Sequence, residues 1–112
     1  MSEVVILVTN SGLGVAEEAL RKKMMGVFLS TLSTFPHLPR KILFYTEGVK
    51  LVVEGSPVVE ELKALEEKGV HLIACGTCLD YFGLKDKVIV GEVGGMAAIL
   101  EAMLEAEKVL TV

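Results

Sequence analysis

The chain of 112 residues has the length of one domain, and its 52% apolar residues suffice for one core, so we expect a single domain over 1–112. The net charge of −4 argues against a nucleic-acid-binding surface, which needs clustered Lys and Arg. No basic, apolar secretory signal opens the chain, and no apolar run approaches the ~20 residues that span a bilayer. The sequence therefore predicts a cytoplasmic protein with no membrane segment. A mean hydropathy of +0.57 also predicts apolar surface buried between subunits.

Five short runs of β-branched and apolar residues predict buried strands: 4–8, 42–45, 70–74, 88–90 and 109–112. Unbroken runs of this kind are typical of strands that helices cover on both faces. Helical patterns lie between them. The order of elements predicts a three-layer α/β/α domain around a mostly parallel five-stranded sheet.

Three helices are predicted. The first has its apolar face at three- and four-residue steps: Ala16, Ala19, Leu20, Met24, Val27, Phe28, Leu32 and Phe35. The second begins at Ser56-Pro57, a cap followed by proline at the first helical position, buries Val58, Leu62 and Leu65, and ends at Gly69. The third runs from about Gly95 to Ala106, with an apolar face on Met96, Ile99, Leu100, Met103 and Leu104.

Three loops follow predicted strands and should open on the same edge of the sheet, where folds of this class place ligands and reactive groups. These loops supply the candidate binding residues Asn10, Ser11, Gly12, Glu47, Gly48, Gly76 and Thr77. Gly12-x-Gly14 is similar to the start of a dinucleotide fingerprint, but Glu17 stands at the third glycine. Turn geometry explains these glycines better, and we expect no cofactor.

The only two cysteines, Cys75 and Cys78, lie where the third predicted strand ends and a short helical turn begins. Backbone N–H groups and the helix dipole there favour a thiolate or persulfide anion on Cys75. A zinc site needs four ligands and this pair supplies two, so we expect no metal. A thiol-disulfide redox pair stays open, although a thioredoxin-like site expects a proline downstream of the cysteines and every proline here lies upstream of Cys75. Inert packing of two small residues also stays open.

The run 69–83, a strand ending in cysteine with a glycine eight residues later, resembles the DsrE/TusD group of small sulfurtransferase and sulfur-carrier subunits. The fuller string LVVEGSPVVEELKALEEKGVHLIACGTCLDYFGL, continuing to KVIVGEV, resembles the DsrE-like C-terminal domain of YedF-type selenium-metabolism proteins. The resemblance implies a Rossmann-like fold and a homo-oligomer, a trimer or a hexamer. It also implies that Cys75 is the sulfur-accepting cysteine and that Cys78 is the added cysteine of the YedF-type CGTC.

The function that follows is a small sulfurtransferase or a carrier of sulfur or selenium. Cys75 takes a sulfane sulfur from a donor persulfide and passes it to an acceptor thiol, while Cys78 either resolves the persulfide or is a second acceptor. YedF-type proteins carry a TusA-like domain ahead of this one, so we expect a separate TusA-like carrier or another protein as donor or acceptor. Many DsrE-like proteins lack the cysteine, so a non-catalytic oligomeric binding or assembly module is the alternative.

Overall fold

The computed structural model describes residues 3–112. The strands are β1 (Val4–Val8), β2 (Lys41–Phe44), β3 (His71–Cys75), β4 (Glu92–Gly94) and β5 (Lys108–Thr111). The α-helices are α1 (Glu18–Leu32), α2 (Val59–Glu67), α3 (Gly76–Tyr81) and α4 (Met96–Glu105), and the 3₁₀ helices are η1 (Thr46–Val52) and η2 (Lys85–Lys87). Within residues 3–112, no helix combines the length and apolar character needed to cross a membrane.

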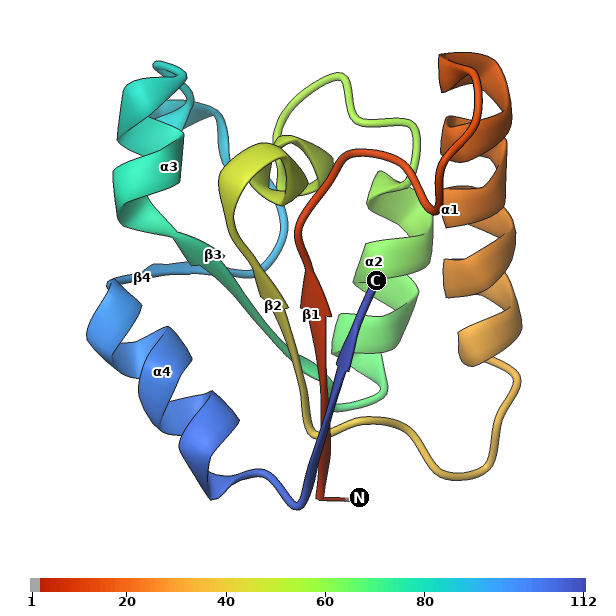
Figure 1. Cartoon of the computed structure of the whole chain (residues 1–112), viewed down its shortest axis with the longest axis vertical. Helices are drawn as coiled ribbons and strands as arrows, with labels where there is room; N and C mark the ends of the chain where they lie inside the picture. The colour runs from red at the N-terminus through yellow and green to blue at the C-terminus, as the bar shows by residue number, and fades with distance from the viewer. Residues whose placement is uncertain (1–2) are drawn as a thin grey trace.

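The strands form one parallel sheet in the order β4-β3-β2-β1-β5. Figure 1 shows α1 and α2 on one side of this sheet and α4 on the other. Parallel neighbours need crossover connections, and these helices provide them while covering both faces. The central strands are accordingly buried, with Ile42, Leu43 and Phe44 of β2 fully inaccessible. The predicted three-layer α/β/α fold is confirmed.

The run 88–90 does not form a strand of the sheet. Its first residue makes only an isolated antiparallel bridge to Val53, and the Ile89 N–H donates to the Val52 carbonyl at 2.9 Å. A turn at Gly91, with φ 75°, then leads into β4, which pairs with the end of β3. The predicted strand is therefore wrong. The run passes beside the end of η1, where Val90 is buried but Ile89 is exposed, and an apolar run alone does not create a sheet ladder.

The helices α1 and α4 bury less of their apolar faces than the pattern predicts. On α1, Met25 and Leu29 face the core, and on α4 Ile99 and Ala102 do so. The exposed apolar side chains of the two helices include Leu20, Met24, Val27, Met96, Leu100 and Leu104. A helix that is apolar on more than one side does not reveal from its sequence which side faces the sheet.

The helix α2 begins at Val59, two residues later than Ser56-Pro57 suggests. Ser56 Oγ accepts a hydrogen bond from the Val58 N–H at 3.3 Å, one turn ahead of the helix itself. The predicted cap position is therefore wrong. The predicted buried face is confirmed, because Leu62 and Leu65 are fully inaccessible.

Candidate functional site: a pair of thiols at the carboxyl edge of the sheet

The two cysteines lie on consecutive elements at the carboxyl edge of the sheet. Cys75 is the last residue of β3, and Cys78 lies in the first turn of α3. Gly76, which follows Cys75, packs closely on β4, since a Cβ there would come 3.2 Å from a methyl group of Val93. Both cysteines are free thiols. Figure 1 shows α3 at the same end of the sheet as η1, the turn that follows β2.

The two thiols differ in exposure. Cys75 is 1% exposed and packs in the core, whereas Cys78 is partly exposed. The helix α3 has only six residues, so its dipole is a weak reason for an anion on Cys75. Position along the chain favours Cys75 as the reactive thiol. In the structure, Cys78 is the more exposed of the two thiols.

Cys78 has a polar neighbour that the sequence does not reveal. The backbone N–H of Thr46 donates a hydrogen bond to Cys78 Sγ at 3.1 Å. Burial raises the pKa of the Cys78 thiol, the Thr46 N–H lowers it, and the neighbouring Cys75 thiol raises it again, with a net pKa above the ordinary value. Cys78 is therefore a neutral thiol at neutral pH, and its sulfur faces a donor that stabilises the thiolate when the proton leaves.

Contacts from the ends of β1 and β2 fix Thr46. Its Oγ1 lies 2.7 Å from the carbonyl oxygens of both Thr9 and Tyr45. Two residues further along η1, Gly48 packs so closely on β1 that a Cβ would overlap the Val8 carbonyl oxygen. The start of η1 is therefore held between two strand ends and the sulfur of Cys78.

The predicted binding residues separate into groups. Three line an open cavity of about 770 Å³ at the carboxyl edge: Asn10, Ser11 and Glu47. Three are buried glycines at which a Cβ would overlap or crowd neighbouring atoms: Gly12, Gly48 and Gly76. Thr77 is exposed on α3 and is not part of this cavity's lining. The glycines thus shape the backbone, and the three polar residues share a surface.

This cavity carries charges of both signs. Its charged lining residues are Glu18, Arg21, Lys22, Glu47, Lys50 and Glu54. Lys50 pairs with Glu47 at 2.6 Å and lies 4.4 Å from the centre of the Phe82 ring. Cys78 is not part of the lining. The cavity is next to the thiol pair because its lining includes Phe82, on the same helical turn as Cys78, and Glu47, the residue after Thr46. A mixed surface of this kind suits a peptide or a small dipolar molecule better than a polyanion.

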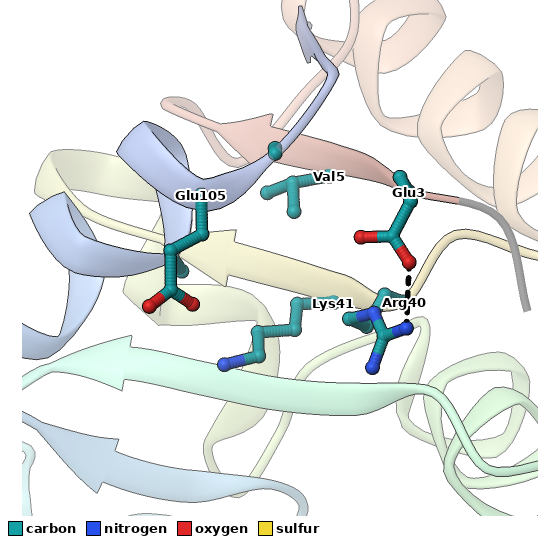
Figure 2. A pocket seen from close by; sticks show the side chains of 7 residues that line it. Glu3, Val5, Arg40, Lys41 and Glu105 are labelled. Atoms are coloured by element: carbon teal, nitrogen blue, oxygen red, sulfur yellow. Dashed lines mark hydrogen bonds and ion pairs between the residues drawn. The ribbon is translucent and has the colours of Figure 1, made fainter.

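A second cavity, of about 330 Å³, lies at the amino edge of the sheet. Figure 2 shows Glu3, Arg40, Lys41 and Glu105 around it, with an ion pair of 2.7 Å between Arg40 and Glu3. Its described lining residues carry two carboxylates and two cations, so their charges balance and do not attract an ion. None of these described residues has a thiol, hydroxyl or imidazole. Both thiols lie at the opposite edge of the sheet.

His71 lies at the other end of β3 from Cys75 and pairs with Glu92 at 2.6 Å. It is therefore too far along the strand to join the thiols as a ligand, since each strand residue advances the chain by about 3.3 Å. Over residues 3–112, no group of three or more His, Cys, Asp and Glu side chains is arranged to hold a metal ion.

Comparison with known proteins identifies the family. The model of the DsrE/DsrF-like family matches residues 4–112. The chain belongs to the DsrE/DsrF-like family. A search of the curated proteins finds no match. The match covers the cysteine pair, and it does not distinguish the YedF-type subclass, which stays a prediction.

Solved structures share the fold of this DsrE/DsrF-like chain. The ychN protein from E. coli is 20% identical over the whole of both chains, with a TM-score of 0.71. The protein MTH1491 from Methanobacterium thermoautotrophicum is 18% identical over 97% of both chains, with a TM-score of 0.72. The protein BT1422 from Bacteroides thetaiotaomicron is 19% identical over 98% of this chain and 95% of its own, with a TM-score of 0.65. At these identities the likeness establishes the fold.

Sequence reasoning missed Thr46, which donates a hydrogen bond to Cys78, and three residues that line the neighbouring cavity, Arg21, Lys50 and Phe82. Phe82 lies four residues after Cys78 on the same short helical turn, which was a usable signal. Thr46 was recognisable as the first residue of a loop. Its contact with Cys78 depends on a positive φ of 49°, which no pattern predicts for a β-branched residue.

Proposed function

We propose that this protein is a small sulfur-transfer subunit that holds a sulfane sulfur as a persulfide on Cys75 and passes it to an acceptor thiol. Membership of the DsrE/DsrF-like family supports a sulfur-relay role at the level of the family. One observation carries the proposal for this chain: two free thiols three residues apart at the carboxyl edge, one buried and one partly exposed. A buried persulfide is shielded from the water and reductants that would remove its outer sulfur.

Sulfur enters through Cys78 in this proposal. The Cys78 thiolate attacks the outer sulfur of a donor persulfide R–S–SH, a new S–S bond forms, the donor's S–S bond breaks, and R–S⁻ leaves. The Cys75 thiolate then attacks the same outer sulfur, giving Cys75–S–SH and returning Cys78 as a thiolate. The reverse steps deliver the sulfur to an acceptor thiolate, with no net oxidation or reduction. This route replaces direct acceptance by Cys75, because Cys75 is only 1% exposed.

A thiol-disulfide role is the second candidate, and the interaction between the two thiols favours it. In that case the Cys78 thiolate attacks the inner sulfur of Cys75–S–SH, HS⁻ leaves, and a Cys75–Cys78 disulfide remains. An external dithiol must then reduce that disulfide before the next cycle. The two candidates differ in their product, which is an acceptor persulfide in one and free sulfide in the other.

We also propose that the chain assembles with copies of itself, as the resemblance to trimers and hexamers implies, and that separate donor and acceptor proteins, such as a TusA-like carrier, exchange sulfur with it. Exposed apolar side chains on both outer helix layers support assembly. One apolar groove of about 380 Å³ runs along α1, lined by Leu13, Met24, Val27, Phe28, Thr31, Leu32 and Phe35. Sedimentation of a clean monomer at micromolar concentration would exclude this assembly.

The function is tested by incubating the purified protein with a small-molecule persulfide and measuring its intact mass. We expect a gain of one sulfur atom, reversed by a dithiol reductant, with the added sulfur on Cys75 in the digested protein. The double variant Cys75→Ser/Cys78→Ser is the control and should gain nothing. Absence of the adduct in the wild type would favour the binding or assembly module. A selenium adduct formed from a selenopersulfide would extend the substrate class to selenium.

A further inference from the structure

The segment that meets Cys78 has an unusual backbone. Thr46 is, among residues 3–112, the one non-glycine residue with a positive φ, at 49°. A β-branched residue rarely adopts this conformation, because its Cβ then crowds the neighbouring carbonyl oxygen. Strain of this kind persists where surrounding contacts impose it, and it is concentrated at functional sites.

Contacts with two strand ends impose the positive φ of Thr46. The Thr46 hydroxyl lies within hydrogen-bond distance of the Thr9 carbonyl at the end of β1, at 2.7 Å, and of the Tyr45 carbonyl at the end of β2. The chain has just left the extended conformation of Tyr45, with φ −142° and ψ 172°, and turns at Thr46 into η1. The Thr46 N–H consequently lies outside the ladder of the sheet, where it donates to Cys78 Sγ at 3.1 Å.

The partner of this N–H is the exposed member of the pair. Three influences act on the Cys78 sulfur, namely its burial, the Cys75 thiol and the Thr46 N–H, and of these only the N–H favours the thiolate. The same hydrogen bond fixes where the sulfur points, because the amide is held by two strands and cannot follow the side chain. A nucleophile that must exchange sulfur with a fixed, buried neighbour gains rate from such fixed orientation.

We propose that Thr46 is a positioning residue for sulfur exchange: its hydroxyl anchors a left-handed turn whose N–H holds the Cys78 sulfur as the nucleophile that trades sulfur with Cys75. This inference rests on the proposed function and specifies which group prepares Cys78. Thr46 touches neither donor nor acceptor. It acts through the orientation and the ionisation of Cys78.

The test compares Thr46→Val, which keeps the shape and removes the hydroxyl, with Thr46→Ser, which keeps the hydroxyl. The matched control is Thr34→Val, because Thr34 also donates its hydroxyl to a backbone carbonyl at 2.7 Å, at the end of α1. We expect Thr46→Val to slow the appearance of sulfur on Cys75 about tenfold and to move the pH midpoint of Cys78 alkylation upward. Thr46→Ser and Thr34→Val should keep the wild-type rate and midpoint.

The two readouts separate this inference from the function on which it rests. If the wild-type protein takes up no sulfur, the proposed function fails, and the pH midpoint of Cys78 alkylation still reports on the hydrogen bond. If Thr46→Val lowers thermal stability alone, with rate and midpoint unchanged, the positioning role is overturned. Should Thr46→Val not fold, Thr46→Gly replaces it, since glycine adopts the positive φ without an anchor. A wild-type rate and midpoint in Thr46→Gly would equally overturn the role of the hydroxyl.

Discussion

Cys75 and Cys78 lie three residues apart but in different surroundings. Cys75 ends an interior strand and is covered by the core, whereas Cys78 lies in the first turn of a short helix, is partly exposed and accepts a hydrogen bond from the N–H of another loop. Position in the chain alone would make Cys75 the thiol that meets a substrate. Because Cys78 is the more exposed thiol, our proposal assigns it the exchange of sulfur with other molecules and assigns storage to the buried Cys75.

The largest effect is expected when Cys78 is removed. In Cys78→Ser, the buried Cys75 meets a donor only when α3 opens locally, so loading of Cys75 should slow about 100-fold or more. Cys75→Ser should still take sulfur on Cys78 but lose it rapidly to a reductant. Both variants are followed by intact mass after mixing with a persulfide. Loading of Cys75 at the wild-type rate in Cys78→Ser would show that Cys75 accepts sulfur directly and would contradict the proposed division of roles between the two cysteines.

Alkylation measures the difference in exposure without any sulfur chemistry. Limiting iodoacetamide should modify Cys78 at least about tenfold faster than Cys75, because a side chain 1% exposed reacts only through local opening. Mass analysis of the digested protein gives the two rates. In denaturant the rates should become similar, which is the control. Faster labelling of Cys75 in the folded protein would mean that Cys75 is accessible in solution and that Cys75, not Cys78, reacts with other molecules.

The contact between η1 and β1 keeps the surroundings of Cys78 in place. In Gly48→Ala the new methyl group would overlap the Val8 carbonyl oxygen, so one backbone must move. We expect a loss of about 1–3 kcal/mol in the free energy of unfolding, the range for overpacking a buried site. Gly95→Ala is the matched control, since no atom lies within 4 Å of its Cβ position. Denaturant unfolding measures both, and equal stability of the two variants would show that η1 moves freely.

The sequence predicted what depends on repeated patterns. Unbroken apolar runs revealed four of the five strands, and the CGTC string located both thiols at the end of the third of these. Individual tertiary contacts could not be predicted from these patterns. The apolar run at 88–90 packs beside η1 instead of joining the sheet. The hydrogen bond from Thr46 to Cys78 joins residues 32 positions apart through a strained turn, which periodicity cannot show.

The pattern also identified apolar helices better than it identified their buried sides. On α1, Met24 was predicted to face the core, yet it is exposed and its neighbour Met25 is buried. A rotation of one residue around a helix changes the facing side by about 100°, and packing against the sheet decides it. The buried side of α2 was easier to predict, because its apolar residues form a single stripe.

The smallest expected effect is a dependence of stability on alkaline pH. The pKa of the Cys78 thiol is raised in the folded protein, first by burial, above its ordinary value of 9.0. A raised pKa means that the folded state binds the proton more tightly, so the contribution to stability is complete below that ordinary value. It is lost as the pH rises through the folded pKa. The wild type should therefore lose stability relative to Cys78→Ser between neutral pH and pH values above the ordinary pKa. Chemical unfolding of both proteins across that range measures the difference, and parallel curves would show that Cys78 is as free to ionise in the folded chain as in the unfolded one.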